Sequence, residues 1–144
     1  MDCHLVSTAY IVRENRVLLI FHKKLQLWLP PGGHVEANET ADQAAVREAQ
    51  EEVRIPIEVV SFQPVLAGPR RPLPLPFSAD IHNVGDHDHW NLSYLARPLA
   101  LPADGKFNTA EIEQMRWFSA KELAEPIILP GVRAQALRAL ELLR

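Results

Sequence analysis

Three glutamates, Glu48, Glu51 and Glu52, lie within about one turn of a predicted helix. Residues three and four apart on a helix have Cβ atoms about 5–6 Å apart, so these carboxylates share one face. Each like-charged pair on that face destabilises the helix by roughly 0.2–0.5 kcal/mol, so the group needs a counter-charge. Arg47 can supply one, and a hard divalent cation, which prefers oxygen ligands, is the stronger candidate. The spacing therefore predicts a carboxylate site for a metal ion.

The helix that carries these glutamates is predicted over residues 40–53. Its apolar residues recur every fourth position: Ala41, Ala45, Ala49 and Val53. Such a stripe is typical of a helix that packs on a sheet, with the carboxylates beside it at the edge of a cleft. A short segment, residues 25–29, ends at Pro30-Pro31-Gly32-Gly33, which predicts a stop followed by a turn that only small residues can make.

The remaining elements alternate between strands and helices. Strands are predicted from β-prone runs at residues 5–12, 17–21, 55–66, 77–84, 90–96 and 113–118. Residues 120–124 predict a short helix capped by Ser119 with Glu122, and residues 132–143 an amphipathic one. Residues 64–76 hold five of the 12 prolines and predict a stiff, extended loop. This order indicates an α/β class, an α/β/α or α+β sandwich, in a single domain over residues 1–144.

Composition excludes several classes of protein. The chain has 144 residues, 47% of them hydrophobic and 23% charged, which is typical of a globular domain. A net charge of −3 gives no reason to expect duplex nucleic acid or an anionic membrane as a partner. The single cysteine, Cys3, cannot form an internal disulfide, and no secretory signal or spanning segment is present. We therefore expect a soluble, cytoplasmic protein. A homodimer is compatible with the fold, although no segment predicts its interface.

The glutamates belong to a longer pattern, Gly33-x5-Glu39-x7-Arg47-Glu48-Ala49-x-Glu51-Glu52-x-Arg54-Ile55. This pattern resembles the box of the Nudix (MutT-like) hydrolases, GX5EX7REUXEEXGU, in which U is apolar. Six of the seven fixed letters match, and the departure is Arg54 in place of glycine. The resemblance implies a Nudix α/β/α sandwich with a mixed sheet. It also implies hydrolysis of a nucleoside diphosphate derivative, dependent on Mg²⁺ or on Mn²⁺.

The resemblance gives the site residues their expected roles. Glu51 and Glu52 are the first choice as metal ligands. Glu48 is a shared ligand or the base that takes a proton from the attacking water, a role typically worth 10²–10⁴-fold in rate. The family further implies that the Gly32 carbonyl is a metal ligand.

Two further acidic residues have supporting roles in this interpretation. Arg47 would orient the glutamates through a bidentate contact, with Glu39 as the expected partner. Glu111 precedes the last predicted strand, where related enzymes can carry an extra acidic ligand or base. Glu113 is two residues away and is an alternative for the same role.

Substrate contacts are predicted outside the box. Arg70 and Arg71 could hold a distal phosphate or could simply keep the proline-rich loop hydrated. His89 and Trp90 are expected at the mouth of the cleft, in contact with a nucleotide-type substrate. A zinc site at His87 and His89 is less favoured, because the neighbouring sequence offers no third soft ligand. The substrate itself stays open among nucleoside triphosphates, ADP-ribose and nucleotide sugars.

Two other functions compete with hydrolysis. The first is a non-catalytic, Nudix-like domain that senses a nucleotide, and Arg54 is the only feature of the sequence that favours it. The second is isomerisation of a prenyl diphosphate on the same scaffold, which needs a reactive acid/base pair. Cys3 is poorly placed for that chemistry because it lies at the N-terminus.

Overall fold

Strand β1 (Cys3–Arg13) runs through the centre of the sheet. The structure, a computed structural model, describes residues 2–61 and 68–144. β1 pairs in parallel with β7 (Asp88–Pro98), in a register that joins Cys3 to Asp88 and Ile11 to Ala96. It also pairs antiparallel with β4 (Gly32–His34) and, at its end, with β2 (Arg16–His22). β1 therefore connects the two parts of the sheet.

The other strands extend the sheet on both sides of β1. β5 (Ile57–Val60) and β6 (Ser78–Asn83) pair with β7, whereas β3 (Trp28–Leu29) and β8 (Ile112–Ser119) pair with β2. These pairings are antiparallel, in contrast to the parallel β1–β7 pair. The predicted mixed sheet is thus confirmed.

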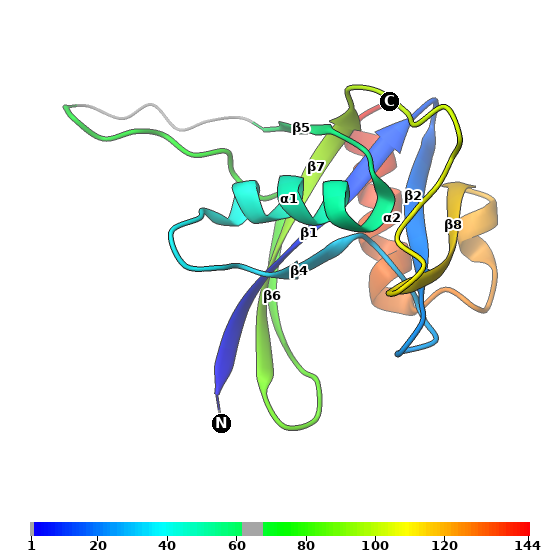
Figure 1. Cartoon of the computed structure of the whole chain (residues 1–144), viewed down its shortest axis with the longest axis horizontal. Helices are drawn as coiled ribbons and strands as arrows, with labels where there is room; N and C mark the ends of the chain where they lie inside the picture. Colours follow the sequence, from blue (N-terminus) through cyan, green and yellow to red (C-terminus); the bar gives the residue numbers. More distant parts are fainter. Residues whose placement is uncertain (1, 62–67) are drawn as a thin grey trace.

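Two helices cover opposite faces of this sheet (Figure 1). Helix α1 (Ala41–Val53) contributes Ala45, Ala49 and Val53 to a core that also holds Leu18 and Ile20. Helix α2 (Pro130–Leu142) packs on the other face, together with the single-turn helix η1 (Glu122–Ala124). Val17 and Leu19 alternate with Leu18 and Ile20 along β2, and they belong to the core on the α2 side. The α/β/α sandwich is therefore confirmed.

The predicted turn at the paired glycines is wrong. Gly32 and Gly33 form part of β4, and neither has the positive φ that a tight glycine turn would use. Glycine is required at Gly32 for close approach, because an added Cβ would lie 2.4 Å from the Ser7 carbonyl oxygen on β1. At Gly32 a small residue is thus needed by strand pairing rather than by turn geometry.

Most other predictions match within a few residues. The strand expected over residues 55–66 is shorter, since β5 covers Ile57–Val60, and residues 62–66 lie outside the described part of the chain. The short helix forms as η1, where Ser119 N donates to Glu122 Oε1 at 3.1 Å and Glu122 N donates to Ser119 Oγ at 3.2 Å. Within residues 2–61 and 68–144, no helix is long and apolar enough to cross a membrane.

Arg54 ends helix α1 in the left-handed conformation, with φ 61° and ψ 30°. Its N–H donates to the Gln50 carbonyl at 3.2 Å. This is the conformation that the glycine of the family pattern would adopt without strain. Arg54 therefore leaves the path of the chain unchanged, at a cost in stability.

Candidate active site

The last two turns of α1 face the β4 backbone, and the fit between them depends on glycine. A Cβ added to Gly33 would lie 2.4 Å from Glu48 Oε1 and 2.6 Å from its Cδ. The Glu48 side chain is only 14% exposed in this position. Gly33 thus creates the space in which the Glu48 carboxylate lies.

Glu52 is the most buried carboxyl group of the cluster. Its residue is 3% exposed, and Oε1 accepts a hydrogen bond of 2.8 Å from Gly32 N. Burial, and then the neighbouring Glu48, Glu111 and Glu51, raise the pKa of Glu52 to about 8, against the effect of that hydrogen bond. Among the described side chains, no Lys or Arg forms an ion pair with Glu52. The site therefore lacks a positive charge at its deepest carboxylate, and a bound divalent cation would supply one.

The two other glutamates of the helix, Glu48 and Glu51, are more exposed than Glu52 and differ from each other in exposure. Burial raises the pKa of Glu48, while the hydrogen bond from Arg47 opposes this change. Glu51 is 55% exposed and lies on the open side of the cluster. The three carboxylates thus form a gradient from buried to accessible, as expected for a site that a hydrated ion and a substrate approach from solvent.

Arg47 connects the glutamates through its whole guanidinium group. Nε and Nη2 donate to the two oxygens of Glu39 at 3.1 and 2.8 Å, which is the predicted bidentate contact. Nη1 donates to Glu48 Oε1 at 2.9 Å and to Glu51 Oε2 at 3.2 Å. The hydrogen bond from Arg47 is the main reason why the pKa of Glu39 is lowered. Arg47 therefore fixes the positions of Glu48 and Glu51 while it keeps Glu39 ionised.

Arg47 also contacts a residue for which no role was predicted. Its Nη2 donates to the His34 carbonyl oxygen at 3.0 Å. His34 is two residues after Gly32 in β4, so the backbone groups of both residues point to the same edge of the strand, towards α1. The position of His34 next to the two glycines was the one hint of this contact in the sequence. The contact itself could not be predicted from residue types, because any residue offers a backbone carbonyl.

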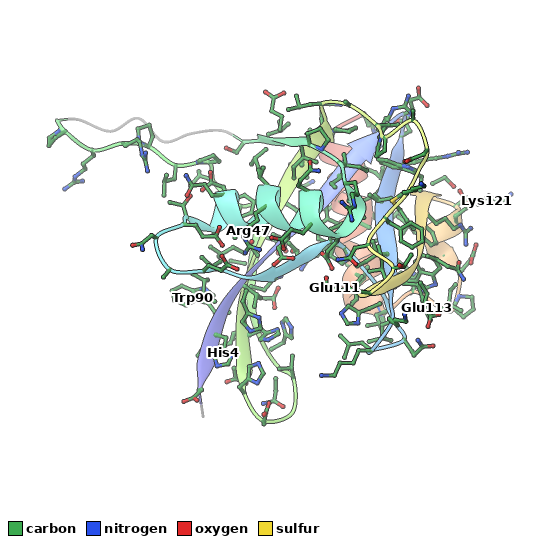
Figure 2. The ribbon with its side chains drawn as sticks, viewed as in Figure 1. His4, Arg47, Trp90, Glu111, Glu113 and Lys121 are labelled. Carbon is green, nitrogen blue, oxygen red and sulfur yellow. The ribbon has the colours of Figure 1, made fainter. Side chains whose placement is uncertain are left out.

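Glu111, rather than Glu113, lies in the field of this cluster. The Glu111 carboxylate contributes to the raised pKa of both Glu48 and Glu52. Glu113 instead accepts a 3.0 Å hydrogen bond from Gln26 Nε2. Figure 2 shows Glu111 beside the end of α1 and Glu113 farther along β8. The structure thus favours Glu111 between the two alternatives.

The predicted substrate contacts are dispersed. Arg70 and Arg71 are exposed in the stretch 68–77 that leads into β6, and within the described residues neither pairs with a carboxylate of the cluster. His89 and Trp90 are consecutive in β7 and point to opposite faces of the sheet. Trp90 is 54% exposed and lines a shallow pocket with Cys3 and Ile81. A substrate on one face would contact only one of the two.

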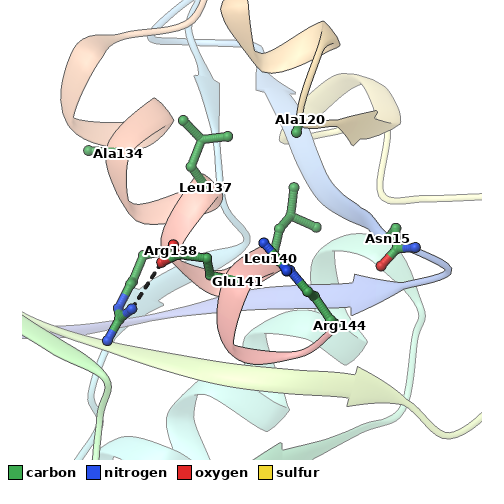
Figure 3. Close-up of a pocket in the computed structure, with 8 residues that line it drawn as sticks. All are labelled: Asn15, Ala120, Ala134, Leu137, Arg138, Leu140, Glu141 and Arg144. Carbon is green, nitrogen blue, oxygen red and sulfur yellow. Dashed lines mark hydrogen bonds and ion pairs between the residues drawn. The ribbon is translucent and has the colours of Figure 1, made fainter.

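A pocket of about 590 Å³ lies elsewhere, at α2 (Figure 3). It is lined by Asn15, by Ala120 and by α2 side chains that include an Arg138–Glu141 ion pair of 2.9 Å. None of the box residues lines it. We locate the candidate active site at the carboxylates, because they supply groups for catalysis and the α2 pocket does not.

Comparison with known proteins gives a consistent result. A family model described as NUDIX domain matches residues 4–140. A NUDIX-family hydrolase from Clostridium perfringens has a similar structure, with a TM-score of 0.83, 26% identity and 100% of both chains covered. A MutT NUDIX hydrolase from Burkholderia pseudomallei has the same fold, with a TM-score of 0.70, 24% identity and 98% of each chain covered.

A curated relative matches over a shorter stretch. The m7GpppN-mRNA hydrolase NUDT17 of Xenopus laevis is 40% identical over 52 residues. The match covers 36% of this chain and only 17% of the frog protein.

Proposed function

This chain belongs to the NUDIX domain family, and we propose that it hydrolyses the diphosphate linkage of a nucleoside diphosphate derivative with the help of Mg²⁺ or Mn²⁺. The observation that carries this proposal is Glu52, a carboxyl group that is 3% exposed and has one N–H donor. Such a group is costly to ionise unless a cation joins it. A divalent ion at this point would also lie within the cluster of Glu48, Glu51 and Glu111.

The groups that would hold the metal are the carboxylates of Glu48, Glu51 and Glu52 and the carbonyl of Gly32. All are oxygen donors, the type that Mg²⁺ prefers, and two or three carboxylates suffice because Mg²⁺ keeps several waters. When bound, the ion neutralises charge on the diphosphate and makes water more acidic.

The protein residues then divide the remaining work. Glu48 takes the proton of the attacking water, as a carboxylate held at one oxygen by Arg47. Its side chain is 14% exposed and is held in place by Arg47, so the carboxylate is positioned to act as that base. Arg47 and Glu39 act as positioning residues, because a displacement of about 1 Å can cost 10²-fold in rate. Glu111 is the additional acidic group.

The proposed substrate is a nucleotide-type molecule with a diphosphate linkage. Arg70 and Arg71 are proposed to meet a distal phosphate, and either His89 or Trp90 to contact the rest of a nucleotide-type molecule. Candidates are nucleoside triphosphates, ADP-ribose and nucleotide sugars. The name of the frog relative specifies m7GpppN-mRNA for that protein, so a cap analogue belongs in the test panel. A cytoplasmic location and a homodimer stay predictions.

The test is product release from this panel, measured with Mg²⁺, with Mn²⁺ and with chelator. Glu52→Gln removes one ligand charge, and the loss of several kcal/mol of charge stabilisation corresponds to about a 10³-fold fall in kcat/KM. Glu58→Gln, an exposed change on β5, is the matched control and should retain full activity. Equal turnover by wild type and Glu52→Gln at saturating Mg²⁺ would refute the proposal.

The same experiment tests the alternative function, a domain that senses a nucleotide without hydrolysing it. Nucleotide binding without hydrolysis across the panel, from folded protein, would favour a non-catalytic domain. Arg54 no longer favours that alternative, because it ends α1 in the conformation that glycine would adopt.

A further inference from the structure

Five of the six histidines gather at one end of the sheet, next to the helix carboxylates but not among them. They are His4, His34, His82, His87 and His89. Neighbouring rings in this group have centroids 4.2–6.4 Å apart. Figure 2 shows His4 on the part of β1 that lies beside the β6–β7 hairpin, whereas Arg47 and Glu111 lie near α1. We call this group the histidine cluster.

Strand pairing explains why residues so distant in sequence meet. In the β1–β7 register His4 lies opposite His89, and in the β6–β7 register His82 lies opposite His89. β4 places His34 opposite Val6, which shares a face of β1 with His4. His87 lies in the turn just before β7, two residues from His89, so the two side chains are on the same side of the chain. The cluster thus draws on four paired strands, β4, β1, β7 and β6, and on the turn between β6 and β7.

The nitrogen atoms of the cluster face one another. His4 Nδ1 is 3.3 Å from His34 Nε2, and His87 Nε2 is 3.0 Å from His89 Nε2. One ligand nitrogen from each of His4, His34 and His87 lies within 4.8 Å of the other two. Tetrahedral Zn²⁺ with Zn–N bonds of about 2.0–2.1 Å needs nitrogens about 3.3–3.4 Å apart. The His4–His34 pair already has this separation, and the ligand nitrogen of His87 lies within 4.8 Å of both.

Two of these rings are hydrogen-bonded by carboxylates through Nδ1, the ring nitrogen that does not face the cluster. Asp86 Oδ1 is 2.6 Å from His87 Nδ1, and Asp80 Oδ1 is 2.7 Å from His82 Nδ1. A carboxylate at Nδ1 fixes the tautomer in which Nε2 carries the free lone pair, the arrangement common around histidine ligands of metals. For His87 this lone pair points into the cluster, towards His89.

We infer that His4, His34 and His87 bind one late first-row transition-metal ion, of which Zn²⁺ is the best fit. Imidazole nitrogen suits Zn²⁺, Ni²⁺ and Cu²⁺, whereas Mg²⁺ requires oxygen ligands. Three protein ligands leave a fourth position for water or for the adjacent His89. The ion would join β1, β4 and the β6–β7 turn. This site is separate from the carboxylate cluster in both position and ligand chemistry.

The test is Zn²⁺ binding to the full chain, purified without a polyhistidine tag. Calorimetric titration in excess Mg²⁺ keeps the carboxylates occupied by the hard cation. We expect one Zn²⁺ per chain, with affinity falling at least 100-fold in His34→Gln and His87→Gln. Asp86→Asn, which removes only the carboxylate behind His87, should cost about 10-fold. His22→Asn is the control, since His22 is outside the cluster and binds the Leu25 N–H instead.

A second measurement does not depend on variants or on activity. Long-range ¹H–¹⁵N NMR spectra of the imidazoles report which nitrogen of each ring is protonated, free or metal-bound. Addition of Zn²⁺ to wild-type protein should shift His4 Nδ1, His34 Nε2 and His87 Nε2 and leave His22 unchanged. Unshifted cluster resonances, or equal Zn²⁺ affinity in wild type and in the two histidine variants, would overturn the proposal. Zn²⁺ binding that Mg²⁺ abolishes would overturn it too, because the ion would then occupy the carboxylates.

Discussion

The contact between Gly33 and Glu48 allows a sharp test of the active-site geometry. In Gly33→Ala the new Cβ would lie 2.4 Å from Glu48 Oε1, whereas ordinary contact begins at 3.4 Å. The carboxylate must therefore move by about 1 Å, the difference between these two distances. A displacement of this size at a catalytic group can cost about 10²-fold. We expect kcat/KM to fall by that factor.

The same substitution should lower stability only moderately. The clashing atoms belong to the end of a flexible side chain, and Gly33 does not have a positive φ. Loss of the hydrogen bond from Arg47, which joins two charged groups, costs about 1.5–3 kcal/mol. Replacement of glycine by alanine returns roughly 0.4–1 kcal/mol through the entropy of the unfolded chain. The free energy of unfolding should therefore fall by about 0.5–2.6 kcal/mol.

Two other glycines provide the comparison. Gly32→Ala would place its Cβ 2.4 Å from the Ser7 carbonyl oxygen and 2.9 Å from Thr8 Cα, so that β1 and β4 must separate. This variant should lose about 1–3 kcal/mol of stability. Gly131→Ala, in α2, meets no atom within 4 Å and should keep wild-type activity, with stability raised by roughly 0.4–1 kcal/mol. Steady-state kinetics and thermal unfolding of the three variants separate the effects. Full activity in folded Gly33→Ala would show that the position of Glu48 does not limit catalysis.

Three further predictions concern pH, the helix end and the arginine. Without metal, stability should fall by a few kcal/mol between about pH 4.5 and 8, because Glu52 ionises at about 8 in the folded chain and near 4.5 when unfolded; thermal unfolding in chelator should show this slope in wild type but not in Glu52→Gln. Arg54→Gly removes left-handed strain at the end of α1 and should add about 1 kcal/mol of stability, or about 3 °C in Tm, with kcat/KM unchanged. A lower Tm in that variant would contradict the strain argument. Arg47→Lys keeps the charge but loses the two-pronged contact with Glu39, so kcat should fall about 10²-fold with little change in KM; an unaltered kcat would mean that charge alone suffices.

Local patterns were sufficient to predict α1 and its carboxylates. The stripe of Ala45, Ala49 and Val53 depends only on helical periodicity, and these residues are buried as expected. The contact between Arg47 and Glu39 followed from the family pattern rather than from spacing. Arg54 likewise has the left-handed backbone conformation that is expected at the end of a helix, where the family pattern has glycine.

The pairing of strands that are distant in the chain could not be predicted from the sequence. β4 is a three-residue strand with two glycines, a composition that disfavours strands, and it forms because β1 offers it a partner. The histidine cluster requires His4 and His89 to be opposite one another, and that depends on the parallel register of β1 and β7. A shift of one residue would place these side chains on opposite faces, and a single sequence does not determine that register.

β4 explains how the two clusters can be neighbours and still differ in chemistry. Gly32 donates its N–H to Glu52, Gly33 leaves room for Glu48, and the His34 carbonyl accepts from Arg47, so the backbone of the strand serves the carboxylates. The His34 side chain belongs instead to the histidine cluster. A single short strand thus supports the oxygen donors of α1 with its backbone and adds a nitrogen donor to the histidine cluster with its last side chain. Because Mg²⁺ prefers oxygen and Zn²⁺ accepts imidazole, ligand type can keep the two ions in separate sites. Binding at either site would restrain β4, so any coupling between the two affinities must be equal in both directions.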